Sequence, residues 1–208
     1  MKLKEGIAVD ASVIESALHP RTVIDTIVSD REEPDLNGEP AITISHSKDI
    51  EAAWVKKGKK TSYGYKLHMA SAVGSGIILG GHITPANRSD MNELPKVLSE
   101  VSIDKHIRCY ADKGYASEAN RQVVTNSGLK DGIMSKAARG RILNHWEQVR
   151  NRCISSSRCG IERLFGDMKR NRKFNRSRYV GLLKVTQEFF LVAFVMNLLR
   201  VVTLTTQW

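Results

Sequence analysis

One segment of the chain has helical spacing and carries a carboxylate between two cations, an arrangement that can act on a charged substrate. At 100° per residue, Arg158, Glu162 and Lys169 fall within about 40° of one another and share one stripe of a helix. Apolar residues recur at helical spacing on the neighbouring face: Ile161, Leu164, Phe165 and Met168. One face can therefore be buried while Glu162 points into a cleft, although an ordinary solvated ion pair on a helix explains the same spacing.

Two aspartates are each associated with a short apolar run of the kind that forms a buried strand. Asp10 is expected at the carboxyl end of a strand within residues 6–12 (GIAVDAS), and Asp112 directly follows residues 107–111 (IRCYA). If these strands are adjacent and parallel, both acids emerge at one edge of the sheet, where open α/β sheets bind ligands. An Asp that only forms a turn or caps a helix is the alternative. Three rival acids end no apolar run: Asp90, Asp104 and Asp131.

A cluster of Asp10, Asp112 and Glu162 would suit phosphodiester chemistry. Mg²⁺ prefers oxygen ligands, and two such ions about 4 Å apart can activate an attacking oxygen and stabilise the leaving one. Three neighbouring carboxylates repel one another without cations, so their convergence would itself indicate metal. The sequence lacks the motifs of other enzyme classes, such as GxSxG, GxxxxGK[ST], HExxH and GxGxxG.

Positive charge is concentrated around Glu162. The 208 residues carry a net charge of +10, and residues 136–178 alone hold thirteen Lys or Arg against three acids, so the rest of the chain is balanced. A localised positive field indicates a polyanion, most simply nucleic acid, over a merely solvated basic surface or an anionic membrane. Four lysines near the middle of the chain are interpreted either as DNA contacts or as a solvated loop: Lys56, Lys57, Lys59 and Lys60.

The order of predicted elements is strand, hairpin, helix, strand, helix, strand, helix, which favours an α/β class with a mixed sheet and helices on both faces. Residues 15–64 are expected to form a long, largely irregular insertion with a short helix over 49–57. The remaining expectations are a hairpin turning at 74–76, helices over 91–100 and 117–127, a basic loop over 136–152 and an apolar helix over 182–202. Within that last helix, the apolar run over 189–202 is short and is interrupted by Asn197 and Arg200, which favours a docked helix over a membrane span. Three cysteines without CxxC spacing, and no signal peptide, favour a cytoplasmic protein.

These motifs resemble those of bacterial insertion-sequence transposases of the DDE type, specifically the IS-five group. The matching segments are VDAS (9–12), YGYKLH (63–68), TPANRSD (84–90) and ADKGY (111–115). The helix of Arg158, Glu162 and Lys169 fits that group's Tyr-x2-Arg-x3-Glu-x6-Lys spacing, with Ser155 at the tyrosine position. The likeness covers nearly the full chain.

The resemblance implies a ribonuclease H-like catalytic domain over residues 1–178, with residues 179–208 as a C-terminal helix packed on it. It implies a DNA transposase that cleaves and rejoins DNA at element ends. Asp10, Asp112 and Glu162 would be the catalytic and metal-binding residues, holding two Mg²⁺ ions that Mn²⁺ can replace. The DNA contacts expected with it are Arg158, Lys169, Arg170, Arg172, Lys173, Lys113 and Tyr115.

Transposases of this group carry a mostly helical N-terminal region, whereas here Asp10 lies almost at the start. We therefore expect a second-frame product or a truncated copy, with an upstream-frame N-terminal partner. The alternatives are an inactive remnant that still binds DNA, or a stand-alone ribonuclease H-like nuclease. The expected partners are element-end and target DNA and further copies of the chain, with no membrane; the expected location is the bacterial cytoplasm, on the nucleoid.

Overall fold

The structure, a computed structural model, describes residues 6–18, 20, 25–28, 42–45, 48–101, 105–138 and 140–206. Asp104 and much of the predicted insertion at 15–64 lie outside these residues. The elements are, in order, β1 (Ile7–Glu15), β2 (Asp25–Val28), β3 (Ile42–Ser45), β4 (Ala53–Lys57), β5 (Lys60–Ala72), β6 (Ile78–Pro85), η1 (Asp90–Asn92), α1 (Leu94–Ser99), β7 (Arg108–Ala111), η2 (Lys113–Tyr115), α2 (Glu118–Asn126), β8 (Lys130–Ile133), α3 (His145–Arg170) and α4 (Leu182–Thr206).

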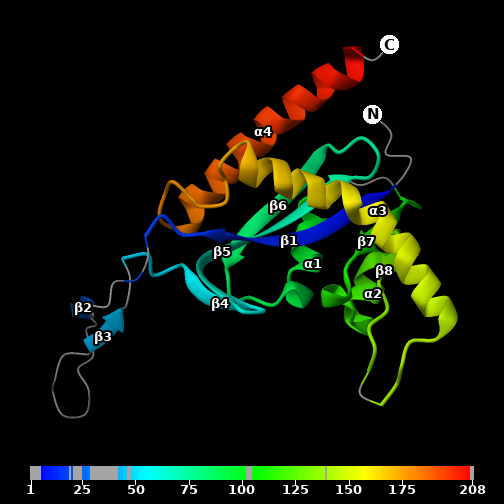
Figure 1. The fold of residues 1–208 in the computed structure, drawn as a ribbon, viewed down its shortest axis with the longest axis horizontal. Helices are drawn as coiled ribbons and strands as arrows, with labels where there is room; N and C mark the ends of the chain where they lie inside the picture. The colour runs from blue at the N-terminus through cyan, green and yellow to red at the C-terminus, as the bar shows by residue number, and fades with distance from the viewer. Residues whose placement is uncertain are drawn as a thin grey trace.

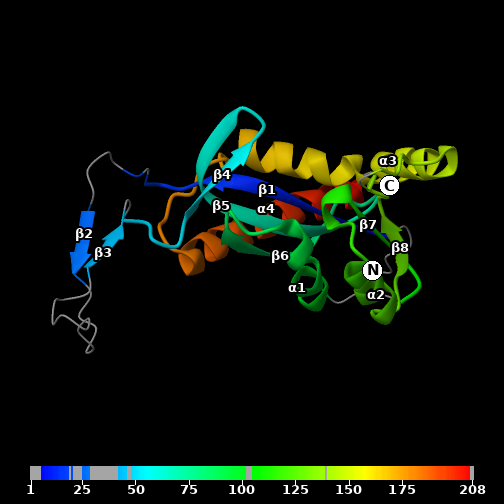
Figure 2. The same ribbon diagram turned by 90° about the horizontal axis from the view of Figure 1, so that it is seen from below.

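Six strands of the described part of the chain form one mixed sheet, in the order β4-β5-β1-β7-β8, with β6 also paired to β5. β5 runs antiparallel to β1, β4 and β6, whereas β1, β7 and β8 are parallel neighbours. β2 and β3 pair separately. Helices cover both faces of the main sheet (Figures 1 and 2). This ribonuclease H-like arrangement confirms the predicted fold class.

The strands that carry the two aspartates are adjacent and parallel, as predicted. Their pairing ends at Val9 opposite Ala111, so Asp10 and Asp112 occupy the next position of the register. The prediction that the first strand ends near Asp10 is wrong, because β1 continues to Glu15 along the antiparallel partner β5. Asp10 therefore lies within β1, at a position where β1 is still paired with β5 but no longer with β7.

The Gly-Ser-Gly turn at residues 74–76 joins β5 to β6 and confirms the predicted hairpin. Gly74 and Gly76 have φ of 81° and 67°, a region that favours glycine. The predicted short helix over 49–57 is wrong, because residues 53–57 form strand β4 on β5. The edge of β5 supplies hydrogen-bond partners, whereas an isolated helix of this length is marginal in water.

Two apolar cores lie on opposite faces of the sheet, because side chains alternate along each strand. Ala8 of β1 packs in the core that includes Phe165 of α3, and Val9 packs in the core that includes Val124 of α2. Figure 2 shows α3 on one side of the sheet and α1 and α2 on the other. Asp10 has the same parity as Ala8 and therefore faces α3.

The helix that carries Glu162 is longer than predicted. α3 begins at His145, so residues 145–152 of the expected basic loop are helical. A capping box sets this start: the Glu147 N–H donates to the Asn144 side chain, and the Asn144 N–H donates to the Glu147 carboxylate. These two residues, three positions apart, are the helix-start signal that the basic composition of the segment obscured.

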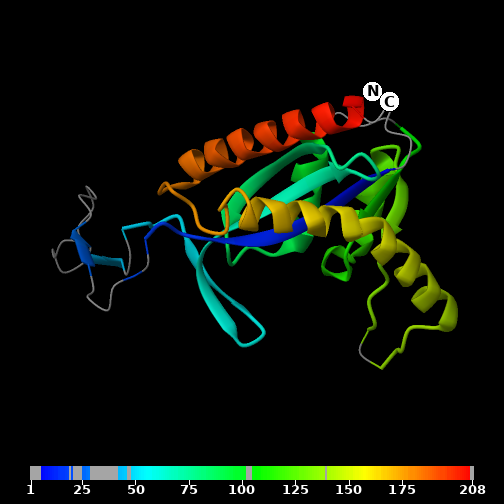
Figure 3. The same cartoon turned by 45° about the horizontal axis from the view of Figure 1, so that its top comes forward.

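α4 extends along the molecule with one side against β6 and the other exposed (Figure 3). The Asn197 side chain exchanges two hydrogen bonds of 2.8 Å with the Ile78 backbone, which fixes the helix on the strand. Among the described residues, α4 alone is long and apolar enough to cross a membrane, a property that core helices share. Its exposed apolar side chains are Leu183, Phe190, Leu191, Phe194, Val195, Leu198, Leu199, Val201 and Val202.

A fully buried histidine in β5 makes the fold sensitive to acid. The His68 ring stacks on His82 with centroids 5.3 Å apart, and its Nε2 lies 3.1 Å from Thr84 Oγ1. Burial, and to a lesser extent His82, lowers the pKa of His68 to about 4, against the pull of neighbouring carboxylates. Between pH 4 and the ordinary histidine pKa of about 6.5, His68 is protonated in the unfolded chain but not in the folded chain, so the folded state loses stability as the pH falls.

We therefore expect His68 to contribute a loss of about 3 kcal/mol in unfolding free energy as the pH falls from 7 to 4. Urea unfolding across this range measures the slope. His68→Gln should remove most of it, because glutamine can bond Thr84 without titrating. An unchanged slope in the variant would assign the acid sensitivity to other groups.

Candidate active site

Three carboxylates from three segments line one cavity of about 560 Å³, here called the carboxylate cavity. Asp10 comes from β1, Asp112 directly follows β7, and Glu162 comes from α3. The structure thus brings together the three acids that the sequence singled out. The other lining residues are Ala11, Ser12, Lys57, Lys113, Met134, Ser155, Arg158 and Phe165.

α3 presents one stripe of side chains to this cavity. Ser155, Arg158, Glu162 and Phe165 recur at spacings of three and four residues, and all line it. The rotation of the helix is set by its apolar face, where Ile161 is 1% exposed in the core. Burial of one face therefore directs Glu162 into the cavity, as the helical periodicity predicted.

The Arg158 guanidinium lies between the two aspartates. Its Nη2 is 2.9 Å from Asp10 Oδ2, and its Nη1 is 3.8 Å from Asp112 Oδ1. The Arg158 side chain is 6% exposed and that of Asp10 is 21% exposed, so this contact is partly shielded from water and stronger than a surface ion pair, whereas the Asp112 side chain is 40% exposed. The prediction of Arg158 as a DNA contact does not fit this structure, because the guanidinium is buried against two carboxylates.

The surroundings of Asp10 disfavour its charged form. Burial raises the pKa of its carboxyl above the ordinary value. Arg158 opposes this, as does the Ala11 N–H, which donates to Asp10 Oδ1 at 2.9 Å. The charges of Asp112 and Glu162 raise the pKa further. For Asp10, Arg158 therefore does not offset burial and the repulsion of the neighbouring acids, and an added cation would stabilise its ionised form.

The chemistry of the donors suits a hard divalent cation. Asp10 and Asp112 offer carboxylate oxygens to the same positive group, and Glu162 faces the same cavity. Within the described residues, no group of three or more His, Cys, Asp or Glu side chains is arranged to hold a metal ion as it stands. Since the Arg158 guanidinium bridges the two aspartates, an ion that binds both must displace or share that contact.

The rival acids that the structure describes are engaged elsewhere. Asp131 pairs with Arg121 and with Arg150, the latter at 3.2 Å. Asp90 pairs with Lys66 at 2.9 Å. Neither acid lines the carboxylate cavity.

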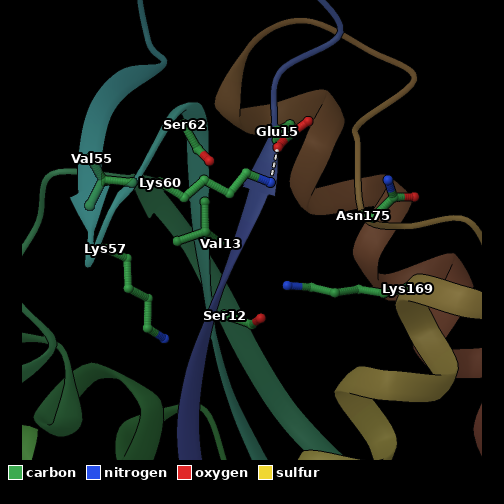
Figure 4. Close-up of a pocket in the computed structure, with 9 residues that line it drawn as sticks. All are labelled: Ser12, Val13, Glu15, Val55, Lys57, Lys60, Ser62, Lys169 and Asn175. Atoms are coloured by element: carbon green, nitrogen blue, oxygen red, sulfur yellow. Dashed lines mark hydrogen bonds and ion pairs between the residues drawn. The ribbon is translucent and has the colours of Figure 1, made fainter.

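The predicted basic DNA contacts divide by position. Lys113 lines the carboxylate cavity, and Lys169 lines a neighbouring cavity shown in Figure 4. Arg170 and Lys173 are exposed at and just beyond the end of α3. Arg172 instead lines a cavity between α3 and α4, away from the three acids.

Tyr115 is a core residue in this structure. Its side chain is 1% exposed and belongs to the same apolar core as Leu94 and Val124. Burial also raises the pKa of its hydroxyl well above the ordinary value. The prediction of Tyr115 as a DNA contact is therefore wrong: the tight turn η2 after Asp112 directs the ring into the core.

Two lining residues escaped the sequence-based prediction. Ser12 lies two residues after Asp10 on the same face of β1, so strand alternation would have found it. Met134 follows β8, and its Sδ lies 3.9 Å from Arg158 Nη1. An isolated methionine after a short strand carries no sequence signal for such a position.

Comparison with known proteins gives a consistent result over nearly the whole chain. A family model described as "Transposase DDE domain" matches residues 2–198. The transposase for insertion sequence element IS1106 of Neisseria meningitidis serogroup B is 36% identical over 200 residues. That alignment covers 95% of this chain and 68% of the relative.

Proposed function

The chain belongs to the family of transposases with a DDE domain, and from this premise we propose that Asp10, Asp112 and Glu162 are its catalytic carboxylates. The chain is thus a DNA transposase of a bacterial insertion sequence. The proposal for the three acids is supported by one observation: they reach a single cavity from β1, from the end of β7 and from α3.

Membership of this family implies use of a divalent metal, and we propose two Mg²⁺ ions that Mn²⁺ can replace. When bound, such ions supply Lewis-acid activation of a phosphodiester and of the attacking oxygen. Asp10 and Asp112 would hold them from the sheet, and Glu162 from α3. Arg158 contacts and orients both aspartates and lowers the pKa of Asp10, and Lys113 at the cavity wall attracts a DNA phosphate by its charge.

The proposed reaction has two steps of the same kind. Water first attacks the phosphodiester at an element end, and the bond from phosphorus to the 3′ oxygen breaks to free a 3′-hydroxyl. That hydroxyl then attacks a phosphodiester of target DNA, so one such bond forms as another breaks. Because the second step exchanges equivalent bonds, it needs no energy source.

One assay tests this function. Purified chain is incubated with a duplex carrying the terminal repeats of the element, a target plasmid, and Mg²⁺, Mn²⁺ or EDTA. Metal-dependent nicking followed by joining to the plasmid is expected. The comparisons favour neither an inactive remnant nor a stand-alone nuclease; binding without nicking would indicate the first, and nicking without joining the second.

We also propose that the chain acts as a homo-oligomer on DNA. An element has two ends, and two copies would provide one carboxylate cavity for each. The exposed apolar side of α4 supports a self-association surface, because monomers seldom expose so long an apolar row.

Light scattering tests this arrangement. The chain is expected to be dimeric, and the double change Leu191→Asp and Phe194→Asp should make it monomeric without altering far-UV circular dichroism, since both side chains are more than half exposed. Lys184→Asp, on the first turn of the same helix, is the control that places an acid there without removing an apolar contact. A monomeric wild-type chain would contradict self-association through α4.

Four further assignments remain proposals. The motifs quoted above support the IS-five group, a catalytic domain over 1–178 with an insertion at 15–64, and residues 179–208 as a C-terminal helix on that domain. An upstream-frame N-terminal partner is compatible with the length of the relative, of which this chain spans 68%. A DNA-binding enzyme of this kind would be nucleoid-associated in the cytoplasm.

A further inference from the structure

A second cavity, of about 310 Å³, adjoins the carboxylate cavity along β1. Ser12 and Lys57 line both, so the two are neighbours. Lys60 and Lys169 also line it, and here it is called the lysine cavity. Figure 4 shows Lys57 and Lys169 extending towards β1 from opposite sides, and Lys60 reaching Glu15.

Strand register and helical spacing bring these lysines together. Lys57 and Lys60 are directly opposed at the β4–β5 turn, so they lie on the same face of that hairpin. Lys169 follows Glu162 by two helical turns, about 10 Å along α3. The lysine cavity therefore continues the stripe of α3 that lines the carboxylate cavity.

Without a ligand, three lysine side chains and the Glu15 carboxylate line one space, which leaves it with a net positive charge. Glu15 pairs with Lys60 at 2.8 Å. Within the described residues, neither Lys57 nor Lys169 makes an ion pair with a carboxylate. Burial, and then the charges of Lys57 and Lys60, lower the pKa of Lys169, and Glu15 only partly opposes them. Like charges directly opposite on a hairpin are destabilising, so an anion in the cavity would relieve the repulsion.

We propose that Lys57 and Lys60 of the β4–β5 turn, together with Lys169, form a phosphate-binding subsite for the DNA strand that enters the carboxylate cavity. This inference rests on the proposed function, because it takes DNA as the polyanion. The β4–β5 hairpin would then hold the sugar-phosphate backbone of the DNA strand beside the phosphodiester that is cleaved. Lys56 and Lys59 of the same hairpin do not line the cavity.

The geometry also gives a position for the bound phosphate. About 10 Å separates Glu162 from Lys169 along α3, and one strand of duplex DNA advances about 3.4 Å per nucleotide. The subsite is therefore expected to contact a phosphate within a few nucleotides of the cleaved bond.

A pair of charge-matched variants tests the subsite. Lys57→Gln with Lys60→Gln removes two charges inside the cavity, and Lys56→Gln with Lys59→Gln removes two charges from the same hairpin outside it. Binding to a fluorescent terminal-repeat duplex is measured in EDTA across a salt series. The first variant should bind about tenfold more weakly at 0.1 M salt, with a salt slope lower by about 1 to 2, and the second should stay within about twofold of wild type.

Phosphate position is tested with duplexes that carry one uncharged methylphosphonate at successive linkages. One linkage within a few nucleotides of the cleaved bond should weaken binding of the wild type and of the outside variant when it is neutralised, and have no further effect on the Lys57/Lys60 variant. Equal weakening of both double variants, or no linkage that distinguishes them, would overturn the subsite. Failure of the proposed catalytic function has a different signature: a wild-type chain that binds these duplexes but cleaves none in Mg²⁺ or Mn²⁺.

Discussion

Replacing Glu162 with glutamine is expected to slow DNA cleavage by about 10³-fold and to leave DNA binding within about twofold. Glutamine keeps the size and hydrogen-bonding capacity of the side chain but cannot contribute the negative charge that a divalent cation requires. The fold should tolerate the change, because Glu162 is exposed on the cavity side of α3 while the opposite face packs in the core. Strand cleavage with Mg²⁺ at saturating protein measures the loss.

Asp167→Asn is the matched control for this experiment. Asp167 lies five residues further along the same helix and lines the cavity between α3 and α4. Both substitutions remove one negative charge from α3, so a general effect on charge or helix stability would appear in both. If Glu162→Gln cleaves as well as Asp167→Asn, Glu162 is not a catalytic residue.

The placement of the three acids could be predicted because each depends on a local periodicity. Two short apolar runs predict buried strands, and their parallel pairing gives Asp10 and Asp112 the same register position. The apolar face of α3 turns Glu162 towards the sheet. The strand and helix signals are properties of a few neighbouring residues, whereas the adjacency of β1 and β7 joins distant segments and could be stated only as a condition.

The wrong predictions concern residues whose state depends on a distant partner. β4 is a strand only because β5 offers an edge, and Tyr115 is buried only because α1 and α2 cover that face of the sheet. Arg158 has the charge and spacing of a phosphate contact, yet two aspartates from elsewhere in the chain engage it. Composition and periodicity contain no information about such partners, and for that reason these three assignments failed.

Replacing Arg158 with methionine should destabilise the metal-free chain by about 2 to 3 kcal/mol, a fall in melting temperature of roughly 4 to 12 °C. Asp10 and Asp112 would then face each other without the guanidinium that contacts both, at 2.9 and 3.8 Å in the wild type. The expected loss is below that of a fully buried pair because the Asp112 side chain is 40% exposed. Arg163→Met, on the exposed side of α3, is the control and should change stability little.

The same substitution should increase the response to divalent cations. In the wild type an incoming ion competes with Arg158 for the two aspartates, whereas in the variant it meets uncompensated carboxylates. Millimolar Mg²⁺ or Mn²⁺ should therefore raise the melting temperature of Arg158→Met more than that of the wild type and recover part of the deficit. Thermal unfolding with EDTA and with each metal measures this difference.

Lowering the pH should, like metal, reduce the stability deficit of Arg158→Met, because the Asp10 carboxyl becomes protonated. Burial already raises the pKa of Asp10 in the wild type. Arg158 is the strongest of the groups that lower this pKa, so its loss raises the pKa further in the variant. A carboxyl whose folded pKa lies above its unfolded value destabilises the fold at high pH and ceases to do so once it is protonated. The deficit of Arg158→Met should therefore shrink as the pH falls from 7 towards 5. Two results would contradict this account: a variant as stable as the wild type without metal, or a stability deficit that neither divalent cations nor a lower pH reduces. Either result would show that Arg158 does not balance the charge of these acids. The assignment of this cavity as a cation site would then lose its electrostatic basis.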